Sequence, residues 1–77
     1  MKLGVKSMKT GVVKSFSVNG KYGFIKPDEE NLKDVFFHQN ELRRSGIEEV
    51  KKGQKLQYHL NIKETKVFAT DIKIIDL

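Results

Sequence analysis

Hydrophobic and polar residues alternate along most of this chain, and turn-forming residues separate the alternating stretches. A period of two is typical of short strands that bury one face. It predicts strands at residues 10–16, 21–27, 34–39, 55–62 and 66–75. The dipeptide Asn19-Gly20 predicts a hairpin turn after the first strand, and Pro27 ends the second.

Residues 39–54 form the one region without alternation. Asn40 is of a residue type that caps helices, so we expect a single helical turn through Leu42 and Arg43 that ends at Gly46. The pair Lys52-Gly53 then predicts a turn into the fourth strand.

These elements predict an all-β fold, a small five-stranded antiparallel barrel with one short helical turn between strands 3 and 4. Closure is expected because no long helix is available to cover the apolar face of an open sheet. A chain of 77 residues holds one domain. We expect residues 9–77 to form it and residues 1–8 to be a mobile basic tail.

The second and third strands each have one purely apolar face and one mixed face. The apolar faces, with Ile25, Val35 and Phe37, should point into the barrel. The mixed faces should then point outward, and they carry Tyr22, Phe24, Lys26, Phe36 and His38. Two alternatives remain: the rings are buried against the long loop, or the register is shifted by one residue, which would bury the lysine and the histidine.

The last two strands show the same alternation. In the fourth, Leu56, Tyr58 and Leu60 share one face, and His59 lies on the other. In the fifth, the pattern places Phe68, Thr70, Ile72 and Ile74 on one face, opposite Ala69, Asp71 and Lys73.

Charge is unevenly distributed along the chain. The formal net charge is +5, and every charged residue up to residue 26 is a lysine. Such a block either forms a solvated surface or binds a polyanion such as nucleic acid. Outward rings interleaved with lysines favour the second interpretation, because bases of a single strand can stack on rings while phosphates pass the ammonium groups. A duplex hides the faces of its bases and cannot use such a surface.

Other features limit the location and chemistry of the protein. There is no cysteine, hence no disulfide and no thiolate metal site. The apolar runs are too short to span a membrane, and the basic N-terminus lacks the apolar core of a signal peptide. We therefore expect a cytoplasmic protein that binds no membrane, no metal and no cofactor.

Two motifs at this spacing resemble those of the cold shock protein family. "KYGFIKP" is similar to the first ribonucleoprotein motif, Lys-Gly-Phe-Gly-Phe-Ile, and "DVFFHQ" to the second, Val-Phe-Val-His-Phe. The surrounding frame is similar too, including "KKGQKLQYHL", and the resemblance covers about residues 9 to 75. It implies an oligonucleotide-binding barrel that binds single-stranded RNA and DNA with little sequence preference and acts as an RNA chaperone. We also expect the protein to be a monomer.

Carried over by position, the resemblance places the family's binding face on five residues: Lys14, Tyr22, Phe24, Phe36 and His38. We add Lys21 as a phosphate contact, with Ser15, Lys26 and Gln39 as further candidates.

The chain also departs from the family pattern. Ser15 stands where the family has a tryptophan, Gln39 where it has a phenylalanine, and Ile47 where its long loop offers an aromatic ring. The lysine before the first motif is displaced by one residue, from Gly20 to Lys21. We expect weaker binding than is usual in the family, because each lost base stack is worth about 1–3 kcal/mol.

Catalysis is disfavoured, because His38 and His59 lie on different strands and no nucleophile, base or metal-ligand spacing is present. A protein-interaction module remains the alternative, since a small barrel with exposed rings can bind an extended, proline-rich peptide. Salt separates the two, because phosphate contacts weaken steeply with salt and ring-to-proline contacts do not.

Overall fold

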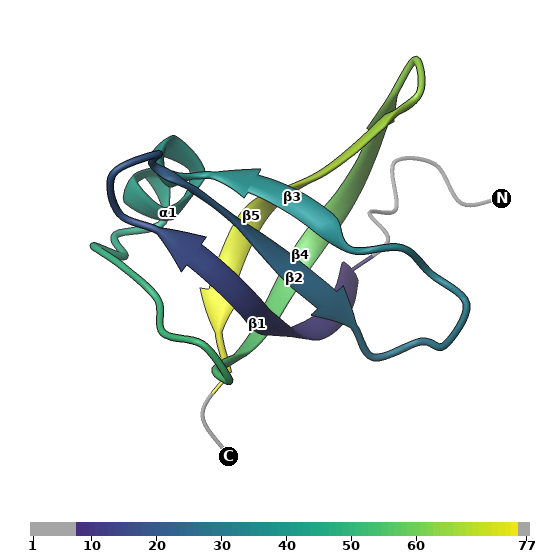
Figure 1. Cartoon of the computed structure of the whole chain (residues 1–77), viewed down its shortest axis with the longest axis horizontal. Coiled ribbons are helices and arrows are strands. Elements are labelled where there is room, and N and C mark those ends of the chain that lie inside the picture. Colours follow the sequence, from purple (N-terminus) through teal and green to yellow (C-terminus); the bar gives the residue numbers. More distant parts are fainter. Residues whose placement is uncertain (1–7, 76–77) are drawn as a thin grey trace, which may run out of the picture.

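The computed structural model describes residues 8–75 and shows a closed barrel of five strands with one short helix (Figure 1). The elements are β1 (Met8–Ser17), β2 (Tyr22–Pro27), β3 (Val35–His38), α1 (Gln39–Arg44), β4 (Lys55–Lys63) and β5 (Lys66–Ile74). The predicted fold class and order of elements are confirmed. Residues 1–7 of the predicted tail lie outside the described residues, and Met8, its last residue, begins β1.

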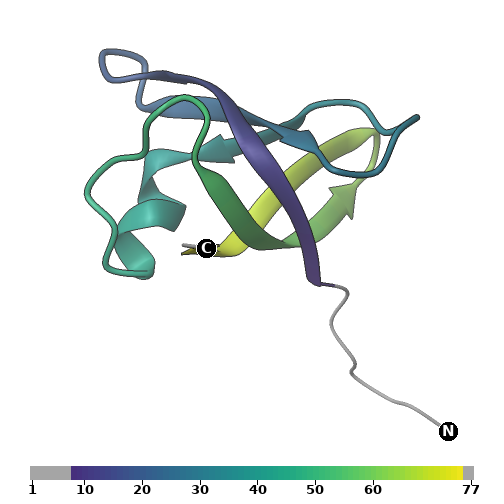
Figure 2. The same ribbon diagram turned by 90° about the horizontal axis from the view of Figure 1, so that it is seen from below.

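Around the barrel the strands follow the order β1-β2-β3-β5-β4. All neighbouring strands pair antiparallel except β3 and β5, which run parallel and share one registered pair, Phe36 with Phe68. Helix α1 lies at one end of the barrel and the β4–β5 hairpin projects at the other (Figures 1 and 2). Within residues 8–75, no helix is long and apolar enough to cross a membrane.

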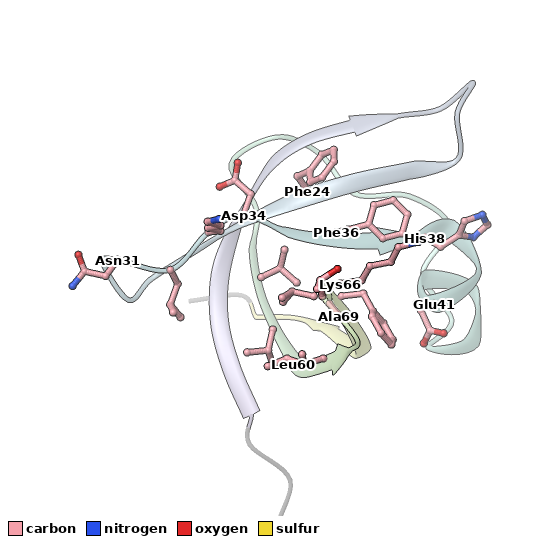
Figure 3. Close-up of a pocket in the computed structure, with 16 residues that line it drawn as sticks. Phe24, Asn31, Asp34, Phe36, His38, Glu41, Leu60, Lys66 and Ala69 are labelled. Atoms are coloured by element: carbon pink, nitrogen blue, oxygen red, sulfur yellow. The ribbon is translucent and has the colours of Figure 1, made fainter.

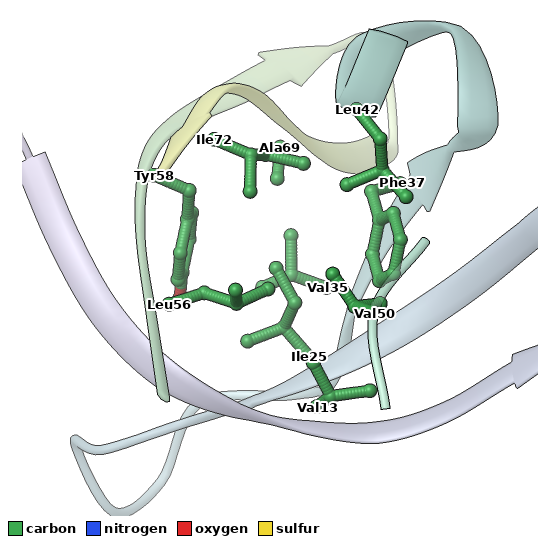
Figure 4. Close-up of a cluster of buried hydrophobic side chains, with 10 residues drawn as sticks. All are labelled: Val13, Ile25, Val35, Phe37, Leu42, Val50, Leu56, Tyr58, Ala69 and Ile72. Atoms are coloured by element: carbon green, nitrogen blue, oxygen red, sulfur yellow. The ribbon is translucent and has the colours of Figure 1, made fainter. Parts of the chain in front are cut away.

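The barrel interior is filled by apolar side chains from all five strands, from α1 and from the loop before β4 (Figure 4). Ile25, Val35 and Phe37 are buried as predicted, whereas Lys26 and His38 are exposed. The predicted register of β2 and β3 is therefore confirmed, and the shifted one is excluded. The buried core residues are Val13, Ile25, Val35, Phe37, Leu42, Val50, Leu56, Tyr58, Ala69 and Ile72.

Tyr58 is the one core residue with a hydroxyl group. In the described part of the chain this hydroxyl has no hydrogen-bond partner, and burial raises the pKa of Tyr58, with the carboxylates of Asp28 and Glu29 adding to the effect.

The predicted alternation in β5 is wrong. Ala69 and Ile72 are both buried although they are three residues apart, and Asp71 between them has a positive φ of 51°. The register with β4 shifts at the same place, because Gln57 pairs with Lys73 whereas His59 pairs with Thr70. This extra residue in β5 is a bulge, which exchanges the two faces of the strand. Phe68 consequently lies on the outside, next to Phe36.

The predicted helix cap is also wrong in position. His38, not Asn40, is the N-cap of α1: its backbone is extended, and its Nδ1 accepts a hydrogen bond from the backbone N–H of Asn40 at 3.0 Å. The helix therefore begins directly where β3 ends. Gly46 follows the C-cap Ser45 with a φ of 79°, which accords with the predicted end.

His59 was expected on the outer face of β4. It lies on the face of β4 opposite buried Tyr58, as predicted, but it is half-buried, and its Nδ1 is enclosed without a hydrogen-bond partner within residues 8–75.

Candidate nucleic-acid interface

Three aromatic rings form a continuous outer surface on β2 and β3, which we call the ring platform: Tyr22, Phe24 and Phe36. The ring centroids of Tyr22 and Phe36 lie 6.0 Å apart in a stacked arrangement, and Phe24 meets Phe36 edge-on at 5.9 Å. Tyr22 is 39% exposed and Phe36 37% exposed, while Phe24, which meets both rings edge-on, is half-buried. A cluster of this kind on a soluble protein marks a binding surface.

Gly23, between the two rings of β2, faces the barrel interior. A Cβ at this position would lie 2.5 Å from the ring of Phe37 and 2.6 Å from the carbonyl oxygen of Ser15. The missing side chain therefore lets Phe37 lie under β2 and lets β1 approach closely. The outer rings are supported from below by a fully packed core.

His38 lies beside the ring platform, opposite Tyr22 in the register of β2 and β3. Its Nδ1 is occupied as acceptor from the Asn40 N–H, so the neutral imidazole carries its proton on Nε2. The exposed edge of the ring can then donate a hydrogen bond to a base or to a phosphate.

Lys14 reaches the platform from β1. The register there shifts, since Val13 pairs with Ile25 but Ser15 pairs with Phe24, and both Lys14 and Ser15 are exposed. The Lys14 ammonium group donates to Oδ2 of Asp34 at 2.6 Å. A phosphate would have to compete with this carboxylate, although exposed ion pairs are worth only about 0–1 kcal/mol.

The remaining predicted residues lie around the platform. Lys21 is exposed in the β1–β2 turn with a φ of 61°, and its carbonyl oxygen accepts from the N–H of half-buried Gln39. Lys26 is exposed on the same face of β2 as Phe24. Ile47 is half-buried and packs against the core.

A groove continues from the platform, and we call it the hairpin groove (Figure 3). It has a volume of about 700 Å³ and lies between β3 with its preceding loop and the β4–β5 hairpin. Figure 3 shows Phe24 and Phe36 along it, with His38 and Glu41 towards one end and Asn31 at the other. Its apolar side chains include Leu32, Leu60, Ile62, Val67 and Phe68.

Phe68 is the ring that sequence reasoning missed. Alternation placed it on the same face as Ile72, and only the bulge at Asp71 brings it outward. The signal in the sequence is weak, because a lone aspartate in an alternating strand does not by itself indicate a bulge. No cluster of three or more potential metal-ligating residues occurs in the described part of the chain.

Comparison with known proteins identifies the family. Residues 9–75 match the family described as the "'Cold-shock' DNA-binding domain". The chain belongs to the cold shock domain family. This domain carries nucleic-acid binding of the cold shock type, and its two ribonucleoprotein motifs here lie on β2 and β3, the strands that form the ring platform.

Three relatives illustrate how far the similarity extends. The chain is 44% identical over 59 residues to a probable cold shock protein, y4cH, of Sinorhizobium fredii, which covers 77% of this chain and 83% of the relative. It is 37% identical over 59 residues to cold shock protein CspA of Rhizobium meliloti, with the same coverage. It is 35% identical over 68 residues to cold shock-like protein CspA of Bordetella pertussis, covering 88% of this chain and all of the relative.

Proposed function

We propose that this cold shock domain binds single-stranded RNA and DNA across the ring platform, with low sequence preference, and acts as a monomeric RNA chaperone. The observation that carries the proposal is the platform itself: three rings within 6.0 Å of their neighbours, on adjacent strands, among exposed lysines. Tyr22, Phe24 and Phe36 would stack bases. Lys14 and Lys21 would meet phosphates, and the Nε2 of His38 would donate a hydrogen bond.

Single strands are favoured by the geometry of this surface. Stacking requires the open face of a base, which a duplex does not present. A chain that holds bases on its rings also prevents them from pairing, which is how a stacking surface would keep transcripts unstructured.

Fluorescence anisotropy with a labelled pyrimidine-rich oligonucleotide and its duplex, at several salt concentrations, tests the proposal. We expect clearly tighter binding of the single strand. If about four lysines meet phosphates, log K falls with log salt at a slope near −3, from about −0.7 per contact. Equal affinity for the duplex would refute stacking and leave only charge attraction.

The apolar hairpin groove gives the alternative, a peptide-binding module, one supporting observation. A proline-rich peptide that binds with little salt dependence, while the oligonucleotide does not bind, would favour this alternative.

A further inference from the structure

The hairpin groove exists because β3 and β5 diverge. The two strands are in register only at Phe36 and Phe68. Towards their N-terminal ends they separate, and residues 31–34 form one wall of the groove while residues 65–67 form the other. Because registered neighbours in a sheet project to the same side, Phe68 extends the row of outer rings onto a third strand.

The groove presents apolar surface to water. Ile62 is 70% exposed and Leu32 is 44% exposed, and both line it together with half-buried Val67 and Phe68. Contiguous exposed apolar surface is costly and marks a ligand site. A volume of about 700 Å³ lies within the range of small-molecule sites and is large enough for a base with its sugar.

The charges along the groove suit an anionic chain. Its two carboxylates are both paired, Asp34 with Lys14 at 2.6 Å and Glu41 with Arg44 at 3.6 Å. Its two lysines, Lys33 and Lys66, come from opposite walls and have no ion-pair partner among residues 8–75. The unpaired charge is therefore positive on both sides of the apolar groove. Like the platform, the groove combines apolar side chains with exposed lysines.

The groove is also continuous with the platform. Phe24 and Phe36 belong to both, and neighbouring strands in a sheet lie about 4.8 Å apart, so Phe68 is the next position across the barrel from Phe36. A strand of nucleic acid leaving Phe36 on that side enters the groove directly.

We propose that the hairpin groove is a further base-binding subsite, in which Phe68 stacks a base of the same single strand that crosses the platform and Lys33 and Lys66 hold its phosphates. This inference rests on the proposed function. It places the extension of the binding track on β5, on the side of the platform away from Ser15.

The test compares wild type with Phe68→Ala on two oligonucleotides, one of about four nucleotides and one of about eight. The longer strand covers platform and groove, so Phe68→Ala should weaken its binding about tenfold while leaving the short strand almost unaffected. Ile74→Ala is the control, because Ile74 is an exposed apolar residue of the same strand, β5, that does not line the groove. It should change neither affinity.

A second measurement reports contact directly and does not depend on a loss of packing. The chain has no tryptophan, so Phe68→Trp introduces a single fluorophore that a stacked base should quench. The Ile74→Trp control should not be quenched. Lys33→Gln and Lys66→Gln should each reduce the salt slope of the longer strand by about 0.7.

Several results would overturn the subsite. They are an equal effect of Phe68→Ala on both lengths, no effect on either, or an unquenched Phe68→Trp. The response of Phe68→Trp to a proline-rich peptide and not to the oligonucleotide would do the same. These outcomes differ from failure of the proposed function, in which wild type would show no preference for single strands and Phe36→Ala would not weaken binding.

Discussion

Phe36 and Phe37 are consecutive residues with the same side chain and opposite environments. Phe36 is 37% exposed on the ring platform, whereas Phe37 is fully buried and stacks on Phe16 at 6.0 Å. The difference arises from the two-residue period of β3 alone. Substitution of Phe36 therefore tests the proposed binding, and substitution of Phe37 tests the stability of the core.

Phe37→Ala should cost about 3–5 kcal/mol in the free energy of unfolding, because it leaves a cavity under Gly23 and Phe16. Phe36→Ala should leave stability nearly unchanged and weaken oligonucleotide binding by about 1–3 kcal/mol, with the salt slope unaltered. Urea denaturation and anisotropy measure the two quantities. A large loss of stability in Phe36→Ala would contradict the assignment of its ring to the platform.

At the scale of elements, alternation predicted β1 to β4 well but not β5. In β2 and β3 the apolar sets are unambiguous, and burying them reproduces the register and the outward rings. In β5 both faces carry apolar residues, so the pattern does not say which face is inside. The bulge at Asp71 decides this through contacts with β4, which are not visible in a local pattern.

The helix shows a similar limit. Its existence between β3 and β4 follows from the break in alternation, but its cap depends on how the chain leaves β3. His38, the last residue of β3, has the extended backbone that an N-cap requires, and its side chain accepts a hydrogen bond from the Asn40 N–H. The cap therefore falls two residues before Asn40, the residue that the sequence suggested.

The β1–β2 hairpin gives an element-scale prediction. Gly23→Ala would bring a methyl group within 2.5 Å of the Phe37 ring and 2.6 Å of the Ser15 carbonyl oxygen, so both β1 and the core must move. We expect a loss of about 1–3 kcal/mol in stability and a weaker platform, measured by urea denaturation and anisotropy. In the double variant Gly23→Ala/Phe37→Leu the contact between the new methyl group and the ring is relieved. Phe37→Leu should therefore lower the free energy of unfolding less in the Gly23→Ala background than in wild type. Additive costs would show that the backbone contact dominates.

At the scale of the whole molecule, one polar cluster joins distant parts of the chain. Asp28, in the loop after β2, accepts hydrogen bonds from Lys55 of β4 and from the Thr10 hydroxyl of β1. These two hydrogen bonds, with that from Lys55 foremost, hold the pKa of Asp28 below its ordinary value of 3.8. The cluster therefore joins the start of the β2–β3 loop to β1 and β4.

A depressed carboxyl pKa stabilises the fold above the unfolded value, and this contribution is lost as the pH falls through the folded value. Asp28→Asn should therefore lower the melting temperature slightly at pH 7, by an amount that is small because the pair is partly exposed. The difference from wild type should be full above the unfolded pKa of 3.8, decrease below it, and disappear once the pH has fallen through the lower pKa of the folded state. Melting curves across this range provide the check, and a difference that remained unchanged at pH 2 would contradict the ionic contribution.

The single registered pair between β3 and β5 has a consequence for the motion of the barrel. Every other seam is held by several registered pairs, so local opening of this closed sheet should begin between Phe36 and Phe68. A nucleic acid that stacks on both rings would contact β3 and β5 at once and would hold the two strands together. Whatever binds only the closed form also stabilises it, so occupancy of the groove and closure of the barrel are thermodynamically linked. The seam with the fewest registered pairs is then also the proposed end of the binding surface.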